Sequence, residues 1–261
     1  MPQTLAAMER ARAGIAFGEV LFVTDRPAAV SAPAGVAVAQ VPSLRSREDY
    51  SHVVQMQLAP HINTPFVMVM QWDGYPVRPE NWTDAFFDYD YIGAPWPQFP
   101  AGVAVGNGGF SLRSQRLLKA CLEPGFQPGH PEDVVICHTN RALLEEAHGL
   151  RFAPLDVAER FSYERMGRAP QSFGFHGLFN MPHEMGIEAF LRFFATVDRA
   201  HIGVRELCDL SDILQRADDP AAREEARRLR AYLLRCRWRD PALWRYVRRK
   251  VARGSSPALI A

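Results

Sequence analysis

The sequence lacks the features that mark disulfide-rich, zinc-binding or membrane-spanning proteins. Its 261 residues include four cysteines, none in a CxxC pair or at a short metal-site spacing. No apolar run approaches the roughly 20 residues that a transmembrane helix needs, and charges come too early at the N-terminus for a secretory signal. Internal repeats and low-complexity tracts are also missing. We therefore expect a soluble protein of a reducing compartment, the cytoplasm.

The chain has almost no excess of positive over negative charge, but its charged residues are unevenly distributed. The formal net charge is only +1, whereas the stretch from Arg223 to Arg253 carries twelve Lys and Arg against three acids. Arg alternates there with Leu, Trp and Tyr. The simplest interpretation is a helical cap with packed aromatics and solvated Arg heads. The stretch also suits peripheral contact with the inner face of an anionic membrane, and nucleic acid is not an expected partner.

Short apolar strands that alternate with helices predict an α/β fold with a sheet covered on both faces. Ser46 and Ser114 are expected to cap helices, and residues 151–158 to form a short strand or edge. From about Gly186 the pattern is helical, with breaks at Gly203, Pro220 and Pro241. We therefore predict an α/β domain over residues 1–185 and a basic helical extension over residues 186–261. The remaining expected strands are 19–25, 35–42 and 66–70, and the remaining helices are 3–13 and 131–147.

The predicted strand "FVMVM" ends in Gln71, Trp72 and Asp73, followed by glycine. A turn is the simplest interpretation, because Asp and Gly are common turn residues. The alternative is a ligand or metal site, since ligands in such sheets bind beyond the carboxyl ends of strands. His176, in the loop "QSFGFHG", is either a packed, hydrogen-bonded histidine or a residue that completes a metal site opened by Asp73.

Two further segments contain candidate binding or catalytic residues. "GNGGFSLR", from Gly106, lets the backbone approach a ligand closely, although such turns are commonly structural and no P-loop Lys-Ser/Thr follows. "HPEDVVI" places Glu132 and Asp133 in the first turn of a helix, where acids interact favourably with the helix dipole. The same position keeps a carboxylate ionised and able to accept a proton. Tyr163 and Glu164, in "FSYE", are expected to pack or to hydrogen-bond a substrate.

Taken in order, six segments resemble a bacterial family of glycosyltransferase-like proteins, the DUF5672 type. They are "VMVMQWDGY", "YDYIGAPWP", "VGNGGFSLRS", "PEDVVIC", "FAPLDVAERFSYE" and "FGFHG". The layout is also similar to GT-A glycosyltransferases of the inverting β-1,3-galactosyltransferase-like branch. In that branch a strand ends in Asp-x-Asp, a Gly-Gly segment follows, and Glu-Asp begins a helix. The resemblance implies a GT-A-like (Rossmann-like) mixed sheet flanked by helices.

The resemblance also implies roles for individual residues. Asp73 matches the last acid of the metal motif, and His176 a further ligand to Mn²⁺ or Mg²⁺. Asp133 matches the catalytic base, with Glu132 beside it. Substrate-binding positions are Gln71, Trp96, Asn107, Gly108, Gly109 and Tyr163. The implied reaction transfers a sugar, with inversion, from a nucleotide-diphosphate donor such as a UDP-sugar to a hydroxyl of a glycan or lipid-linked acceptor.

Two departures from the pattern keep another function open. Gln71 stands where the metal motif has its first acid, and Met1 falls almost directly at the first helix. Related chains typically begin with a strand that helps to hold the nucleotide base, so either the true start lies upstream of Met1 or this protein lacks that strand and part of its donor pocket. The alternative function is a non-catalytic nucleotide-sugar or glycan-binding module. A hydrolase built on Asp73 and Asp133 is disfavoured, because no activated nucleophile is evident.

Overall fold

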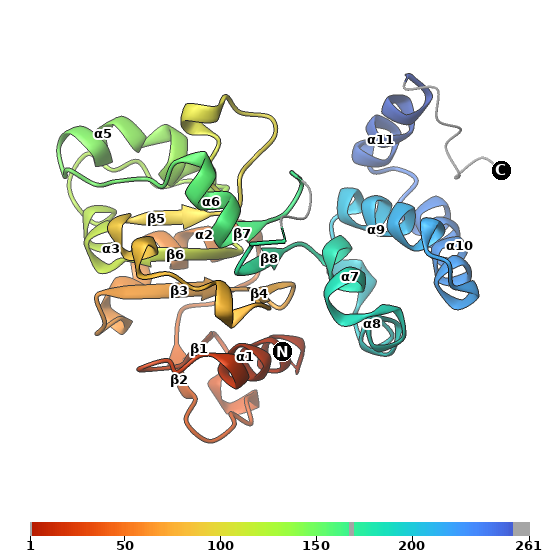
Figure 1. Cartoon of the computed structure of the whole chain (residues 1–261), viewed down its shortest axis with the longest axis horizontal. Coiled ribbons are helices and arrows are strands. Elements are labelled where there is room, and N and C mark those ends of the chain that lie inside the picture. Colours follow the sequence, from red (N-terminus) through yellow and green to blue (C-terminus); the bar gives the residue numbers. More distant parts are fainter. Residues whose placement is uncertain (1, 167–169, 253–261) are drawn as a thin grey trace. The chain divides into compact units, whose positions relative to one another are not determined.

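The computed structural model describes residues 2–166 and 170–252 and divides the chain into two compact units (Figure 1). The first unit extends to His176 and contains the strands. The second begins at Gly177 and is helical. The predicted boundary, after residue 185, falls slightly later along the chain.

The first unit is a mixed α/β structure, which agrees with the predicted class, but its strands form three small sheets (Figure 1). In the first sheet, β1 (Leu21–Thr24) and β2 (Ala37–Gln40) are parallel. The second sheet is antiparallel, in the order β3 (Phe66–Met70), β6 (Phe110–Ser114) and β5 (Tyr91–Gly93). In the third, β8 (Gly174–His176) lies between β4 (Gly74–Pro76) and β7 (Ser162–Tyr163).

The apolar run of β3 is explained by packing on both of its faces, where each of its residues is half-buried. Phe66, Met68 and Met70 pack on a cluster that includes Phe110, Phe161 and Phe173. Val67 and Val69 point the other way, onto a smaller cluster of Leu58, Ile62 and Leu118. Alternate residues of a strand face opposite sides. A strand covered on both sides therefore has an uninterrupted apolar sequence, as predicted.

Two predicted helix starts are confirmed by their capping contacts. Ser46 and Asp49 form a reciprocal capping box ahead of α2 (Arg47–His52). The Ser114 hydroxyl accepts a hydrogen bond from Leu117 N at the start of α3 (Gln115–Ala120). Helix α1 spans Pro2–Gly14, and α2 continues through a π-helical turn at Val53–Gln57. Short 3₁₀ turns occupy Pro27–Ala29, Ala59–His61, Pro79–Asn81, Asp84–Asp88 and Ala101–Val103.

The helix expected over residues 131–147 is present in three consecutive pieces. These are α4 (Glu132–Val134), a π-helical turn (Val135–Thr139) and α5 (Arg141–Glu146). The strand expected at 151–158 is wrong for most of its length. Only Phe152 makes a strand-like bridge, to Tyr91, and α6 (Leu155–Phe161) begins after Pro154. The helix forms because it buries Val157, Ala158 and Phe161 together, at helical spacing.

The second unit confirms the helical prediction and its three breaks. Gly203 is the N-cap of α9 (Val204–Arg216), and Pro220 and Pro241 begin α10 (Pro220–Cys236) and α11 (Pro241–Ala252). Buried leucines hold these helices together. Ahead of them lie α7 (Met181–Met185), α8 (Ile187–Phe194) and 3₁₀ turns at Leu178–Asn180 and Arg199–His201. Within the described residues, no helix combines the length and apolar character needed to cross a membrane.

Candidate functional site

The predicted site residues converge on the turn formed by Asn107, Gly108 and Gly109, which leads into β6. Asn107 has a φ of 53° and is the one non-glycine residue of the described chain in the left-handed region. Asn tolerates this conformation better than most residues do. We call these three residues the 107–109 turn.

On one side, the 107–109 turn is tied to the predicted base. Gly108 N donates to Asp133 Oδ2 at 3.0 Å, and Val134 N donates to Asp133 Oδ1 at 2.9 Å. The half-buried Asp133 lies in the first turn of α4. A carboxylate has about four acceptor positions. The two backbone bonds therefore orient the side chain and leave acceptor capacity on it.

Beneath Asp133 lies a buried ion pair that sequence reasoning missed. Arg113, on β6, has no exposed surface, and its Nη2 lies 3.0 Å from Glu132 Oε1. The guanidinium also donates to Ser111 Oγ at 3.0 Å and to the Gly108 carbonyl at 3.4 Å. Arg113 therefore links the 107–109 turn to the start of α4. The only sequence signal is an Arg within the strand-like run "FSLRS", which does not indicate burial by itself.

Glu132 is placed as the partner of Arg113. Burial raises the pKa of Glu132 above that of an exposed glutamate, and the nearby Arg113 guanidinium opposes this rise. A cation and an anion that are buried together offset the cost of losing water only when they pair closely with each other. The position of Glu132 accordingly supports the orientation of the adjacent Asp133.

On the other side of the turn lies His176, the last residue of β8. Residue Gly74 of β4 pairs with His176, which brings the neighbouring Asp73 to the imidazole. His176 Nε2 is 3.8 Å from Asp73 Oδ1 and 3.5 Å from Gln71 Oε1. The pairing of β4 with β8 therefore brings His176 to two predicted residues, Gln71 and Asp73, that lie about a hundred positions earlier in the sequence.

The second imidazole nitrogen contacts the 107–109 turn. His176 Nδ1 is 3.0 Å from Asn107 Nδ2 and 3.6 Å from Glu164 Oε1. When Asn107 presents its NH₂ group, Nδ1 is the acceptor and the neutral ring carries its proton on Nε2. If Asn107 instead turns its oxygen toward Nδ1, the ring carries its proton on Nδ1, and Nε2 is free to bind a cation. Glu164, which was predicted together with Tyr163, therefore lies beside His176 in the site.

The two glycines of the turn are needed because side chains occupy the space beside them. A Cβ on Gly108 would lie 1.9 Å from Glu132 Oε1, and one on Gly109 would lie 2.0 Å from His176 Nε2. Both distances are far inside van der Waals contact. The glycines therefore allow Glu132 and His176 to approach the backbone, and their predicted contact with a substrate stays a prediction.

Three buried oxygens of the site have no hydrogen-bond partner among the described residues. They are Asp73 Oδ1, Asn107 Oδ1 and Glu132 Oε2. Buried polar atoms are nearly always paired, and an unpaired one costs about 1–3 kcal/mol. All three atoms are acceptors. Arg113 Nη1, a donor of the same ion pair as Glu132, is unpaired among the described residues too, so Asp73 Oδ1 and Asn107 Oδ1 are the atoms that favour a ligand with hydrogen-bond donors or a cation.

The site does not form a complete metal centre by itself. Within the described residues, no three His, Cys, Asp or Glu side chains come together in a metal-binding group. Asp73 and His176 provide one carboxylate oxygen and one imidazole nitrogen, and Gln71 provides an amide oxygen. With the Asn107 oxygen turned toward His176 Nδ1, this donor set fits a divalent cation whose remaining ligands are oxygens from outside the protein.

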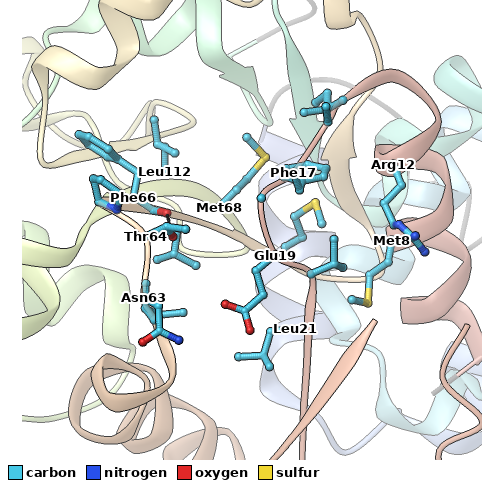
Figure 2. Close-up of a pocket in the computed structure, with 18 of the residues that line it drawn as sticks. Met8, Arg12, Phe17, Glu19, Leu21, Asn63, Thr64, Phe66, Met68 and Leu112 are labelled. Carbon is cyan, nitrogen blue, oxygen red and sulfur yellow. Dashed lines mark hydrogen bonds between the residues drawn. The ribbon is translucent and has the colours of Figure 1, made fainter. Parts of the chain in front are cut away.

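Trp96 and Tyr163 flank the site in apolar surroundings. A Cβ on Gly106 would lie 2.0 Å from the Trp96 ring, which also stacks near His138. Tyr163 is buried on β7, where it pairs with Phe175, the neighbour of His176. Both residues thus adjoin residues of the site, and their predicted contact with a substrate stays a prediction. A cavity elsewhere in the first unit (Figure 2) is lined by none of the predicted site residues.

Comparison with known protein families identifies the chain. Residues 36–176 match the family described as "Protein of unknown function (DUF5672)". The match covers more than half of the 261 residues, so the chain belongs to this family, as predicted. No curated protein matches it. The matched range contains every residue of the site and ends at His176.

Proposed function

We propose that the protein is a glycosyltransferase of GT-A-like architecture. It transfers a sugar from a nucleotide-diphosphate donor, such as a UDP-sugar, to a hydroxyl of a glycan or lipid-linked acceptor. The observation that carries the proposal is the 107–109 turn, which joins an oriented carboxylate, Asp133, to a group of buried acceptor oxygens around His176. A group of hydrogen-bond acceptors suits a sugar, because each sugar hydroxyl can donate a hydrogen bond.

In the proposed reaction Asp133 is the general base. It takes the proton of the acceptor hydroxyl while that oxygen forms a bond to the anomeric carbon. The bond from the anomeric carbon to the diphosphate breaks, and the nucleoside diphosphate leaves with the electron pair. Attack on the face opposite the leaving group inverts the configuration. The two backbone bonds to Asp133 hold its carboxylate in one orientation for this step.

Asp73 and His176 would hold Mn²⁺ or Mg²⁺ jointly with the donor diphosphate. When bound, the cation supplies positive charge for the leaving group. Because the protein donors are few, the cation and the nucleotide are expected to bind together. Mn²⁺ alone should leave the melting temperature unchanged, whereas Mn²⁺ with UDP should raise it.

The test combines binding with turnover. Thermal shifts are measured with UDP, GDP and their sugars, with and without Mn²⁺, and slow hydrolysis of the donor is then followed. Asp133→Asn should abolish turnover and keep nucleotide binding, because the amide nearly preserves the shape of the side chain. Asp88→Asn is the matched control, since Asp88 is exposed and outside the site.

Different results identify different functions. Turnover that survives in Asp133→Asn contradicts the role of this residue as base. Nucleotide binding by the unaltered protein without turnover against acceptor libraries supports the alternative, a non-catalytic nucleotide-sugar or glycan-binding module. Gln71 favours this alternative, because it stands where the metal motif has its first acid.

We further propose that the second unit contacts an anionic membrane surface, on the cytoplasmic side. Trp238 and Trp244 are 51% and 46% exposed, and the Trp244 indole N–H donates to the Trp238 carbonyl at 2.7 Å. Arg239 lies over the Trp238 ring. Exposed indoles beside exposed arginines suit a lipid headgroup region. Further exposed arginines nearby are Arg235, Arg245, Arg248 and Arg249.

Sedimentation with vesicles tests this contact. Binding to phosphatidylcholine vesicles that contain phosphatidylglycerol should exceed binding to phosphatidylcholine alone and should weaken with salt. Trp238→Ala/Trp244→Ala should reduce binding. Leu122→Ala, which removes an exposed apolar side chain of the first unit, is the control. Equal binding to both vesicle types, or no effect of the double substitution, would contradict the proposal.

A further inference from the structure

Residues 127–131 lead into α4, the short helix that carries Asp133, and we call them the lead-in segment. They form neither helix nor strand. Helix α4 itself has only three residues. Such a helix cannot fix its own position, because isolated helices shorter than about 12–15 residues are marginal in water. The position of Asp133 therefore depends on the contacts that the surrounding chain makes with α4 and with the lead-in segment.

One of these contacts is a clasp made by Gln55, in the π-helical turn that follows α2. The amide NH₂ of Gln55 donates to the Gly129 carbonyl at 2.8 Å, and its amide oxygen accepts from Gly129 N at 3.0 Å. Both backbone groups of Gly129 are thus bonded to one side chain, as they would be to a neighbouring strand. Gln55 is only 1% exposed. This buried side chain therefore fixes both the position and the orientation of Gly129.

A second contact from α2 holds the next residue of the lead-in segment. Ser51 is buried, and its Oγ lies 2.8 Å from His130 Nδ1. A hydroxyl can donate or accept a hydrogen bond, so this contact forms with either tautomer of the imidazole. Residues four apart in a helix lie on the same face. This spacing explains why Ser51 and Gln55 reach neighbouring residues of the lead-in segment.

A third buried side chain, Asn140, closes the lead-in segment and α4 into one loop. Asn140 Oδ1 accepts from Gln127 N at 2.8 Å, and Asn140 Nδ2 donates to the Gln127 carbonyl at 3.0 Å. The same Nδ2 lies 3.1 Å from the carbonyl oxygen of Val135, the residue that follows α4. The start of the lead-in segment and the end of α4 are therefore held to one side chain, and the loop between them has a defined shape.

Two anchors attach this loop to the rest of the first unit. Glu132 pairs with Arg113 on β6, and Gln55 and Ser51 bind the lead-in segment to α2. A loop that is held at a single point can pivot about that point, whereas two separate anchors prevent the motion. The α2 anchor therefore decides whether Asp133, which is adjacent to Glu132, keeps its place.

We propose that Gln55 is a positioning residue for Asp133. The catalytic part of this inference rests on the proposed function, in which Asp133 is the general base. Gln55 acts through the lead-in segment and takes no part in the chemistry. It keeps α4 where the Asp133 carboxylate accepts the hydrogen bonds of Gly108 N and Val134 N. Ser51 supports the same anchor with one bond instead of two.

The test replaces Gln55 by Met, which keeps the length of the side chain and removes both bonds of the clasp. Gln115→Met is the matched control. Gln115 Nε2 also donates to a backbone carbonyl, that of Ile62 at 2.7 Å, and Gln115 lies outside the site and the lead-in segment. Ser51→Ala is a milder second variant. Urea unfolding establishes that each variant is folded under the assay conditions.

The first measurement is hydrolysis of the nucleotide-sugar donor. Gln55→Met should lower kcat by about 10- to 100-fold, because a misplacement of about 1 Å can cost that much. KM for the donor should stay within about a factor of two, since the residues proposed to hold the donor diphosphate lie on the His176 side of the 107–109 turn. Ser51→Ala should lower kcat less. Gln115→Met should leave both constants near those of the parent.

The second measurement, amide hydrogen exchange, does not depend on turnover. The amides of Gly108 and Val134 donate to the Asp133 side chain, so they should exchange about tenfold faster in Gln55→Met than in the parent. Exchange at Gly129, which loses its Gln55 acceptor directly, is the positive control. The matched control variant should exchange at the rate of the parent at all three amides.

The combined results decide between the outcomes. Unchanged exchange at Gly108 and Val134 in Gln55→Met would overturn the proposal, whatever the activity. Equal losses of kcat in Gln55→Met and Gln115→Met would also overturn it, because they would reflect general destabilisation. Faster exchange at both amides in a protein whose parent hydrolyses no donor would support the positioning of Asp133 by Gln55 and contradict the proposed function alone.

Discussion

Replacement of Glu132 by Gln tests the buried ion pair beneath the site. The Gln side chain keeps the size of Glu132 and an oxygen for the Arg113 bond, so the change removes charge with little loss of packing. Arg113 has no exposed surface and would keep a buried guanidinium without a counter-charge. Loss of one partner of a buried pair costs about 3–5 kcal/mol. We expect a destabilisation of that size for Glu132→Gln.

The opposite substitution, Arg113→Met, should have a distinct pH dependence. Without the guanidinium, only burial acts on Glu132, and its folded-state pKa moves further above the unfolded value. The folded state then binds the proton more tightly than the unfolded state does. The stability that this pKa shift contributes is fully present below the unfolded-state pKa of Glu132 and is lost as pH rises through its folded-state pKa. Arg113→Met should therefore gain stability relative to the parent on acidification, and Glu132→Gln should lack this gain.

The assay is urea unfolding followed by tryptophan fluorescence. Substitution of Trp238 and Trp244 by Phe leaves Trp72, Trp82 and Trp96, all in the first unit, as reporters. The double variant Arg113→Met/Glu132→Gln should lose less than the sum of the single losses, since the pair acts as a unit. A loss below about 1 kcal/mol for Glu132→Gln, or strictly additive losses, would refute the reasoning, because such values are typical of exposed pairs.

Three further predictions concern separate parts of the chain. Gly109→Ala should lower the free energy of unfolding by about 1–3 kcal/mol, because the added methyl would meet His176. Gly102→Ala, with no atom near the added methyl, should change it by less than about 1 kcal/mol in the same urea assay. Burial raises the pKa of the Cys121 and Cys208 thiols to about 12, so native protein at pH 8 should react with a thiol reagent first at the exposed Cys236. The same shift means that stability falls as pH rises from about 9 to 12, and Cys121→Ala should reduce this slope by about 1.4 kcal/mol per pH unit, measured by urea unfolding. Ser46→Ala should cost about 1 kcal/mol by loss of the capping box, and Ser31→Ala, at an exposed loop position, should cost close to nothing.

Features that depend on nearby residues were predictable from the sequence. The Ser46 and Ser114 caps, the breaks at Gly203 and Pro220, and the buried strand from Phe66 follow from local hydrogen bonding, backbone restriction and side-chain alternation. Helix α6 was missed because "RFAPLDVA" is apolar and short. Its periodicity does not distinguish a strand edge from a buried helix, and contact with the core decides between them.

The sequence by itself determined the class of the fold, the positions of the helix caps and breaks, and the segments by which the family is recognised. Only the tertiary structure decided that Arg113 pairs with Glu132, that Asn107 contacts His176, and that Asp73 reaches the imidazole through the pairing of β4 with β8. The physical reason is sequence separation. A cap or a break is an interaction within one turn of chain, whereas these contacts join residues far apart and exist only after the strands have paired.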